Sequence, residues 1–232
     1  MRVIRNERHI RVRSFIGKNA TLAGMFTLLA GLIISLAKPE WITPLMVCMV
    51  VGMGLSLFGG VFADRYVGPL AHHDGLVAAL KGMDSRHVLL QYVLPAPHVL
   101  FGPGGLTVLV VKSHGGEVIC QEEGRWKHRQ RGKVLRQFVG QQGIGMPDYE
   151  AESQAAKLGR WLAAKVPGVE VPVQTAIVFT NPNVRLDAAT SPVPAFYGKK
   201  VKAWLRGPGR LKPLPSDVYR QLAEALDVES QE

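Results

Sequence analysis

Basic side chains are the residues of this chain whose spacing most clearly indicates binding to another molecule. Two clusters of lysine and arginine lie in its second half, and neither contains an acidic residue. Such clusters bind polyanions by releasing counterions, and Trp126 or Trp204 within them could stack on a nucleic-acid base. The first cluster comprises Arg125, Lys127, Arg129, Arg131, Lys133 and Arg136, and the second comprises Lys199, Lys200, Lys202, Arg206, Arg210 and Lys212.

The same clusters suit a second kind of partner. A domain that is tethered close to an anionic membrane leaflet also gains from basic faces, because these faces lie against the lipid headgroups. We place membrane lipids with anionic headgroups ahead of nucleic acid, which stays open as the alternative partner. Other subunits of a membrane complex are a further class of partner.

The remaining reactive residues form no recognisable site in the sequence. His72 and His73 are adjacent, so on a helix their side chains diverge by about 100° and share a metal poorly. No histidine spacing matches a zinc motif, and two cysteines cannot build a disulfide framework. The turn Gly102-Pro103-Gly104-Gly105 lacks the Gly-Lys-Ser/Thr ending of a phosphate-binding loop. We therefore expect no metal and no cofactor.

The chain divides into an apolar part and a part of ordinary composition. Its 232 residues are 47% hydrophobic and 20% charged, which excludes a disordered basic tail. Ala20–Ala37 and Ile42–Ala63 carry no charge, and about 20 apolar residues in a helix cross the hydrocarbon core of a membrane. The link Lys38-Pro39-Glu40-Trp41 contains a helix-stopping proline. The sequence therefore predicts a transmembrane helical hairpin over residues 20–63.

The start of the chain gives the orientation of this hairpin. Residues 1–19 form a basic lead, which the positive-inside rule places in the cytoplasm, and the hairpin returns the rest of the chain to the same side. This predicts an integral membrane protein with two spans and cytoplasmic termini. The alternative is a signal peptide cleaved after Ser35-Leu36-Ala37. The basic residues of the lead are Arg2, Arg5, Arg8, Arg11, Arg13 and Lys18.

Small residues recur every four positions in both apolar segments and predict how the two helices pack. Small side chains let two helix backbones approach closely in lipid, where no hydrophobic drive brings helices together. The alternative is that glycine and serine are simply common in such helices. The predicted packing residues are Thr27, Gly31 and Ser35 in the first helix and Gly52, Ser56 and Gly60 in the second.

The rest of the chain reads as a mixed α/β (α+β) domain over residues 64–198, with a basic segment and helix over residues 199–232. The early strands follow one another like an antiparallel meander. Residues 129–147 and the residues rich in Asn and Pro that follow Thr180 are expected to form loops. We expect helices near Leu70–Leu80, over Ala151–Val166 and from a cap at Ser216-Asp217, and strands over His87–Leu94, His98–Phe101, Leu106–Lys112, Glu117–Cys120, Val171–Thr180 and Lys199–Leu205.

One stretch of this domain resembles a known family. The sequence LPAPHVLFGPGGLTVLVVKSHGGEVICQEEGRW is similar to the core of the nuclease-related domain (NERD), a branch of the PD-(D/E)XK nuclease fold. The resemblance covers residues 72–190 and implies that fold. The positions that match the family in order and spacing are His98, Gly102, Gly104 or Gly105, Lys112, Gly116, Trp126 and Gln154.

The residues that depart from the family pattern decide what this resemblance implies for activity. In that fold two carboxylates hold a divalent metal and a lysine activates water, but Pro97 and Val110 occupy the positions of those two acids. The resemblance therefore implies a catalytically degenerate site with His98, Lys112 and Gln154 as remnants. Acids that could substitute are Asp74, Asp84, Glu117, Glu122 and Glu123.

Three hypotheses for function follow. The first is a membrane-anchored, degenerate NERD-like module that binds or scaffolds at the cytoplasmic face of a membrane, with no enzyme activity. The second is an accessory structural subunit of a larger membrane protein complex. The third is a metal-dependent nuclease with relocated carboxylates, the one hypothesis that requires Mg²⁺.

Overall fold

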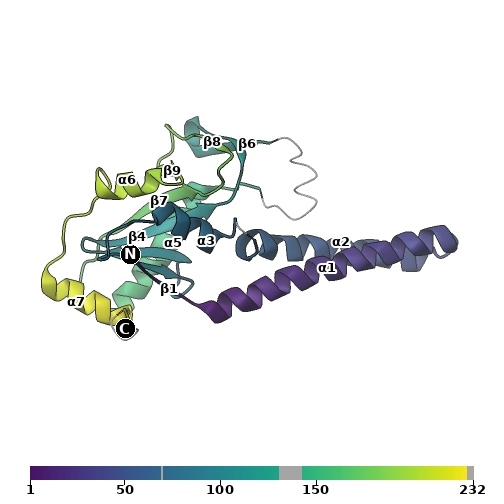
Figure 1. Cartoon of the computed structure of the whole chain (residues 1–232), viewed down its shortest axis with the longest axis horizontal. Helices are drawn as coiled ribbons and strands as arrows, with labels where there is room; N and C mark the ends of the chain where they lie inside the picture. Colours follow the sequence, from purple (N-terminus) through teal and green to yellow (C-terminus); the bar gives the residue numbers. More distant parts are fainter. Residues whose placement is uncertain (69, 131–142, 229–232) are drawn as a thin grey trace. The chain divides into compact units, whose positions relative to one another are not determined.

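The computed structural model describes residues 1–68, 70–130 and 143–228 (Figure 1). The chain forms two compact units. The first joins Met1–Asn6 with His72–Arg129 and the chain from Ile144 onward, and the second is built mainly from Glu7–Ala71. The sheet domain is therefore assembled from segments on both sides of the apolar helices in the sequence.

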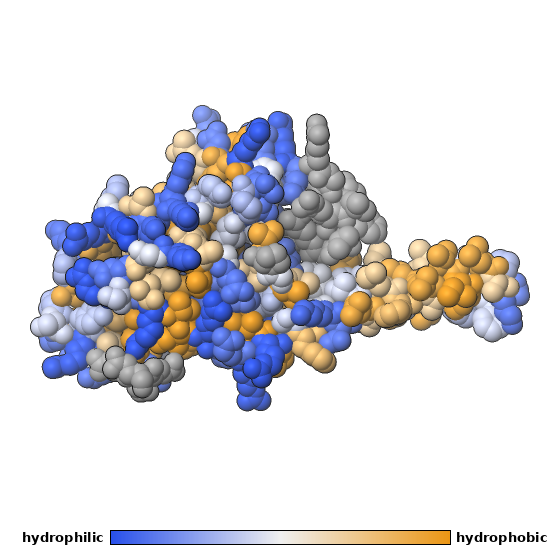
Figure 2. Space-filling view, viewed as in Figure 1, coloured by the Kyte–Doolittle hydropathy of each residue, from blue (hydrophilic) through white to orange (hydrophobic). Residues whose placement is uncertain are grey.

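The second unit is a hairpin of two helices, α1 (Glu7–Ala37) and α2 (Ile42–Tyr66). Both are long and apolar enough to cross a membrane. Only 11% of the apolar window of α1 and 17% of that of α2 is buried, whereas the core helix of a soluble domain is mostly buried. Figure 2 shows the surface of the hairpin as hydrophobic along most of its length and hydrophilic at its tip.

The basic lead differs from the separate segment predicted for residues 1–19. Arg2–Arg5 form the strand β1, which pairs in parallel with β2 (Val88–Gln91) of the sheet domain. Ile4 enters the core with 7% of its surface exposed, and the helix α1 begins directly afterwards at Glu7. The sequence did not indicate this strand among the basic residues, because its apolar part, Val3 and Ile4, is only two residues long.

The sheet domain contains a six-stranded sheet in the order β1-β2-β3-β4-β7-β9. The pairs β2–β3 and β3–β4 are antiparallel, whereas β4–β7 and β7–β9 are parallel. The strands not yet delimited are β3 (His98–Gly102), β4 (Gly105–Lys112), β7 (Val173–Phe179) and β9 (Ala195–Tyr197).

A second, three-stranded sheet has the order β6-β5-β8. Its strands are β5 (Gly116–Gln121), β6 (Arg125–Arg129) and β8 (Val184–Asp187), and the short 3₁₀ helix η1 (Glu122–Gly124) connects β5 to β6. The predicted antiparallel meander therefore holds for β2 to β4 and stops there. The strand β5 leaves the first sheet because β7 occupies the free edge of β4.

Helices cover both faces of the six-stranded sheet because its central strands are apolar on both sides. On one face, α5 (Pro147–Lys165) and α7 (Ser216–Ala225) bury Leu158 and Leu222 with Phe101. On the other face, α3 (His72–Leu80) and α6 (Lys200–Arg206) bury Leu80 and Leu205 with strand residues that include Leu100 and Leu109. The three layers confirm a mixed α/β domain.

Three local predictions were wrong. Lys199–Leu205 was expected as a strand but lies in α6, because Val201 and Leu205 are four residues apart and share the buried face of one helix. The loop expected after β7 contains β8 and β9. The helix α7 begins at Ser216, but its N-cap position is Pro215, and no side chain in the described part of the chain caps it.

Glycines seven residues apart form the contact between α1 and α2. Gly17, Gly24 and Gly31 are the buried small residues of α1, and a Cβ on Gly24 would lie 2.6 Å from the backbone nitrogen of Ser56. Of the predicted packing residues, Gly31, Gly52 and Gly60 are buried, whereas Thr27, Ser35 and Ser56 are half-buried. A seven-residue repeat keeps one stripe facing its partner when helices coil gently around each other.

We expect Gly24→Leu to weaken the hairpin, because the larger side chain would push the backbones of α1 and α2 apart. Overpacking of this kind costs about 1–3 kcal/mol. The matched control is Gly54→Leu on α2, where no described atom beyond the adjoining residues and backbone of its own helix lies within 4 Å of an added Cβ. Denaturant-induced unfolding in detergent micelles measures the difference, and equal stability of the two variants would contradict the proposed contact.

Candidate functional site

The carboxyl end of β4 brings together two of the residues that the family resemblance singled out. Lys112 donates a hydrogen bond from Nζ to Glu150 Oε2 at 2.7 Å, and Gln154 donates from Nε2 to Glu150 Oε1 at 3.1 Å. Glu150 and Gln154 lie one turn apart on α5. Sequence reasoning missed Glu150, because it expected the helix to start at Ala151 and therefore overlooked the four-residue spacing to Gln154.

The start of α5 is fixed by a buried carboxylate. Asp148, in the first turn of the helix, is 8% exposed. It accepts hydrogen bonds from Trp126 Nε1 at 2.5 Å and from Ser191 Oγ at 2.9 Å. Because Asp148 lies two residues before Glu150, these bonds also set where the Glu150 side chain meets Lys112.

In a nuclease of the resembled family, metal ligands lie close to the lysine. In this chain the corresponding place beside Lys112 is apolar. Val110 lies on the same face of β4 as Lys112 and is 1% exposed. It packs in a cluster that contains Val118 and Phe179. Among the described residues, no group of three or more His, Cys, Asp or Glu side chains is placed to hold a metal ion. The carboxylate of Glu150 neutralises the charge of Lys112.

The acids considered as substitutes lie elsewhere. Asp74 pairs with Arg5 at 3.1 Å, and Asp84 pairs with Arg86 at 2.6 Å. Glu117 and Glu122 are exposed on the second sheet and on η1. The side chain of Glu123 lies outside the part of the chain that the structure describes. Relocated carboxylates at these described positions therefore do not contact Lys112.

His98, the third remnant residue, is a buried core histidine. It is 3% exposed, and its ring packs edge-on against Tyr92 at 4.9 Å between centroids. Burial, with a smaller effect from the neighbouring His73, lowers the pKa of His98 to about 3. The ring is therefore neutral at physiological pH and adds no charge to the Lys112 corner.

Part of the first basic cluster forms a row on the second sheet. Arg125, Lys127 and Arg129 are exposed and alternate along β6 with side chains that point inward. Trp126 was predicted as a stacking platform, but it faces the interior, where its ring lies 5.8 Å from that of Phe179. The other members of the cluster, Arg131, Lys133 and Arg136, lie outside the described residues.

The second basic cluster contains exposed lysines and side chains bound to backbone carbonyls. Lys199 and Lys200 are exposed at the start of α6, whereas Lys202 donates a hydrogen bond to the carbonyl oxygen of Lys81 at 2.8 Å. Trp204 is half-buried and packs against Phe196 with ring centroids 5.1 Å apart. Arg206 donates a hydrogen bond to the carbonyl oxygen of Gly82, next to the carbonyl that Lys202 binds.

A cavity of about 600 Å³ lies at the opposite end of β4 from Lys112. The loop after α3, the β3–β4 turn and the segment after α6 surround it. Sequence reasoning missed this site, although the glycine-rich turn and the second basic cluster both contribute to it. Its polar lining residues are Asp84, Arg86, His87, Thr107, Gln174, Arg206 and Arg210, and its larger apolar ones are Met83, Leu100, Leu205 and Leu211.

Comparison of the chain with models of protein families, with curated proteins and with solved structures finds no match. The resemblance to the NERD family therefore stays a prediction from the residues quoted for it.

We expect Glu150→Gln to destabilise the domain by about 1–2 kcal/mol. The substitution leaves the ammonium of Lys112, whose side chain is only 13% exposed, without its counter-charge. Glu152→Gln is the control, because Glu152 is exposed on the same helix. Chemical denaturation of both variants measures the effect, and the prediction fails if they unfold at the same denaturant concentration.

Proposed function

We propose that this chain is a membrane-anchored binding module. In this proposal α1 and α2 cross the membrane, both termini lie in the cytoplasm, and the sheet domain binds an anionic ligand without cleaving nucleic acid. The evidence for the loss of catalysis is that Glu150 neutralises Lys112 and that the neighbouring Val110 is buried. The evidence for the membrane anchor is the exposed apolar surface of the hairpin.

The dimensions of the two helices support the anchor. At 1.5 Å per residue, the 31 residues of α1 extend over about 46 Å and the 25 residues of α2 over about 37 Å. Both exceed the roughly 30 Å of a hydrocarbon core.

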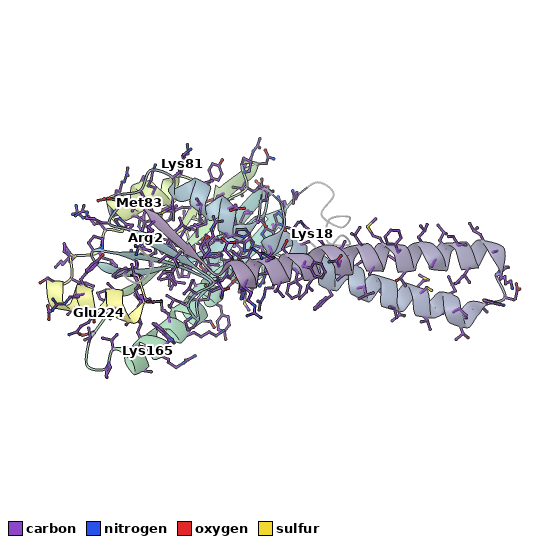
Figure 3. All side chains as sticks on the ribbon, turned by 60° about the horizontal axis from the view of Figure 1, so that its bottom comes forward. Arg2, Lys18, Lys81, Met83, Lys165 and Glu224 are labelled. Atoms are coloured by element: carbon purple, nitrogen blue, oxygen red, sulfur yellow. The ribbon has the colours of Figure 1, made fainter. Side chains whose placement is uncertain are left out.

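The outward-facing side chains of the hairpin support the anchor as well. Figure 3 shows side chains projecting away from both helices along their length. Large apolar residues are among them: Phe26 is 68% exposed, Leu36 is 79% exposed and Val50 is 67% exposed. A lipid phase would cover this surface and remove the cost of exposing it to water.

The two ends of the hairpin differ in charge, which supports the orientation. The end where α1 begins carries Arg8, Arg11 and Arg13. The opposite end carries Lys38, whose ammonium lies 4.4 Å from the centre of the Trp41 ring, and Glu40. The positive-inside rule assigns the arginine-rich end to the cytoplasm.

The row of basic side chains on β6 supports contact with an anionic surface. Arg125, Lys127 and Arg129 repeat at about 6.6 Å along the strand, since each residue advances the chain by about 3.3 Å. Each such cation near an anionic leaflet contributes about 1 kcal/mol of attraction. We propose lipid headgroups as the partner of this row.

The absence of cleavage is tested with the full chain in detergent micelles. A truncated chain that starts at residue 64 is unsuitable, because it lacks β1. We expect no Mg²⁺- or Mn²⁺-dependent cleavage of single- or double-stranded DNA, because the metal-binding pair of carboxylates is missing at Lys112. Metal-dependent cleavage that Lys112→Ala abolishes would overturn the proposal, and a known metal-dependent nuclease serves as the positive control.

The orientation is tested by labelling introduced cysteines with a membrane-impermeant maleimide. In a Cys48→Ser, Cys120→Ser background, Glu40→Cys is expected to react in intact cells. Lys200→Cys is the matched position in the sheet domain, and it should react only after permeabilisation. Labelling of Lys200→Cys in intact cells would show that the topology is wrong.

A further inference from the structure

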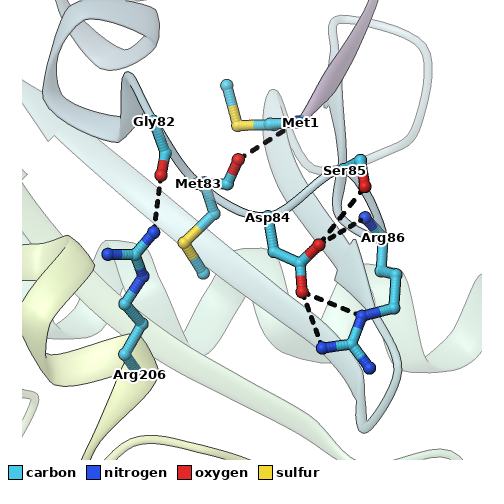
Figure 4. Close-up of polar contacts among 7 residues, drawn as sticks. All are labelled: Met1, Gly82, Met83, Asp84, Ser85, Arg86 and Arg206. Atoms are coloured by element: carbon cyan, nitrogen blue, oxygen red, sulfur yellow. Dashed lines mark hydrogen bonds and ion pairs between the residues drawn. The ribbon is translucent and has the colours of Figure 1, made fainter.

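The cavity at the turn end of β4 has a wall that is fixed by hydrogen bonds before any ligand binds. Arg206 donates a hydrogen bond to the carbonyl oxygen of Gly82 at 2.5 Å. The N-terminal ammonium of Met1 donates to the carbonyl oxygen of Met83 at 3.2 Å (Figure 4). The backbone nitrogen of His87 donates to the carbonyl oxygen of Asp84 at 3.1 Å. A pre-formed wall lowers the entropy lost on binding.

Arginines dominate the charge of the cavity. Its charged lining residues are Asp84 and three arginines, Arg86, Arg206 and Arg210, which give a net charge of +2. Asp84 accepts a hydrogen bond from Arg86. This bond lowers the pKa of Asp84 to about 2, so Asp84 is already paired with an arginine of the lining. In Figure 4 this pair lies on one side of Met83 and Arg206 lies on the other. Arg206 and Arg210 therefore carry the charge that no acid in the lining neutralises.

Arg210 is the cation best placed to meet a ligand. It is exposed at the cavity, and within the described part of the chain its side chain forms no hydrogen bond or ion pair. Three residues separate it from Arg206 in the segment that follows α6. Paired guanidinium groups bind phosphate oxygens with good geometry, because each group offers a planar fork of N–H donors.

The glycine-rich turn explains how this cationic segment reaches the sheet. A Cβ on Gly104 would lie 2.7 Å from the carbonyl oxygen of Leu211, and Gly105 has a φ of +127°. The backbone nitrogen of Leu214 donates to the carbonyl oxygen of Pro103 at 2.9 Å. Glycine at Gly104 is therefore required for the segment 207–214 to lie against the turn and place Arg210 at the cavity.

The remaining lining adds an apolar surface and neutral polar groups. Leu100, Leu205 and Leu211 provide the apolar part. Gln174 donates to Thr107 Oγ1 and to the carbonyl oxygen of Gly209, both at 2.9 Å. Within the described residues His87 Nδ1 is buried without a hydrogen-bond partner, and burial lowers the pKa of His87.

We infer that this cavity binds a small organic phosphate, with the phosphate held by Arg206 and Arg210 and its organic group against Leu100, Leu205 and Leu211. The volume of about 600 Å³ lies within the range of small-molecule sites, which is roughly 300–1,000 Å³ and far exceeds a phosphate ion alone. The inference rests on the proposed role of the domain as a binding module. A soluble phosphate ester and a phospholipid headgroup share this chemistry.

The test is a fluorescence titration of the full chain in detergent micelles with trinitrophenyl-ADP, which carries phosphates and an apolar aromatic group. We expect saturable binding that weakens about tenfold in Arg210→Gln, because a tenfold change corresponds to about 1.4 kcal/mol, the size of one hydrogen bond to a charged group. Arg206→Gln/Arg210→Gln should weaken binding further. Arg220→Gln, an exposed arginine on α7 away from the cavity, should bind like the unmodified chain.

Competition then identifies the source of the phosphate. Displacement of the dye by ADP would assign a soluble ligand, and displacement by dihexanoyl-phosphatidylglycerol would assign a lipid headgroup. The inference is overturned if the dye does not bind saturably, if Arg210→Gln binds it unchanged, or if no phosphate-bearing competitor displaces it. Metal-dependent DNA cleavage would overturn the proposed function alone, and loss of dye binding would overturn the cavity assignment alone.

Discussion

The parallel pairing of β4 with β7 is the interaction on which the arrangement of the sheet domain depends. It runs along β4 from Leu106 to Lys112, and it leaves no edge for β5, which forms a second sheet with β6 and β8. The helix α5 lies in the chain between β4 and β7 and packs on the face of β4 that contains Val108. This packing places Glu150 next to Lys112. Without this pairing, the lysine at the end of β4 would have a different neighbour.

The same strand separates two regions of opposite character. At its carboxyl end, Lys112 is neutralised by Glu150 and sits beside the buried Val110. At its amino end, the turn around Gly104 holds a cationic segment against a cavity. The carboxylates of a nuclease metal site are missing at the first end, whereas the proposed phosphate site has Arg206 and Arg210 at the second end.

The helical hairpin follows a separate constraint. Its apolar side chains face outward, so the contact between α1 and α2 relies on close approach at Gly17, Gly24 and Gly31. Close backbone packing supplies dispersion contacts where burial of apolar surface from lipid supplies none. In the proposed anchor the large side chains face the lipid, and the charged residues lie at the two ends.

The sequence by itself determined the two apolar helices, the strands from β2 to β4 and the helix α5, because each depends on a local pattern of apolar spacing. From the resemblance it also predicts that Pro97 and Val110 stand where the resembled family has acids. Only the tertiary structure decided which residues meet across long separations. Glu150 with Lys112, Arg206 with Gly82 and Leu211 with Gly104 each join distant segments, and no periodicity encodes such pairs. The short strand β1 also escaped the sequence, since its stability comes from pairing with β2 rather than from its own residues.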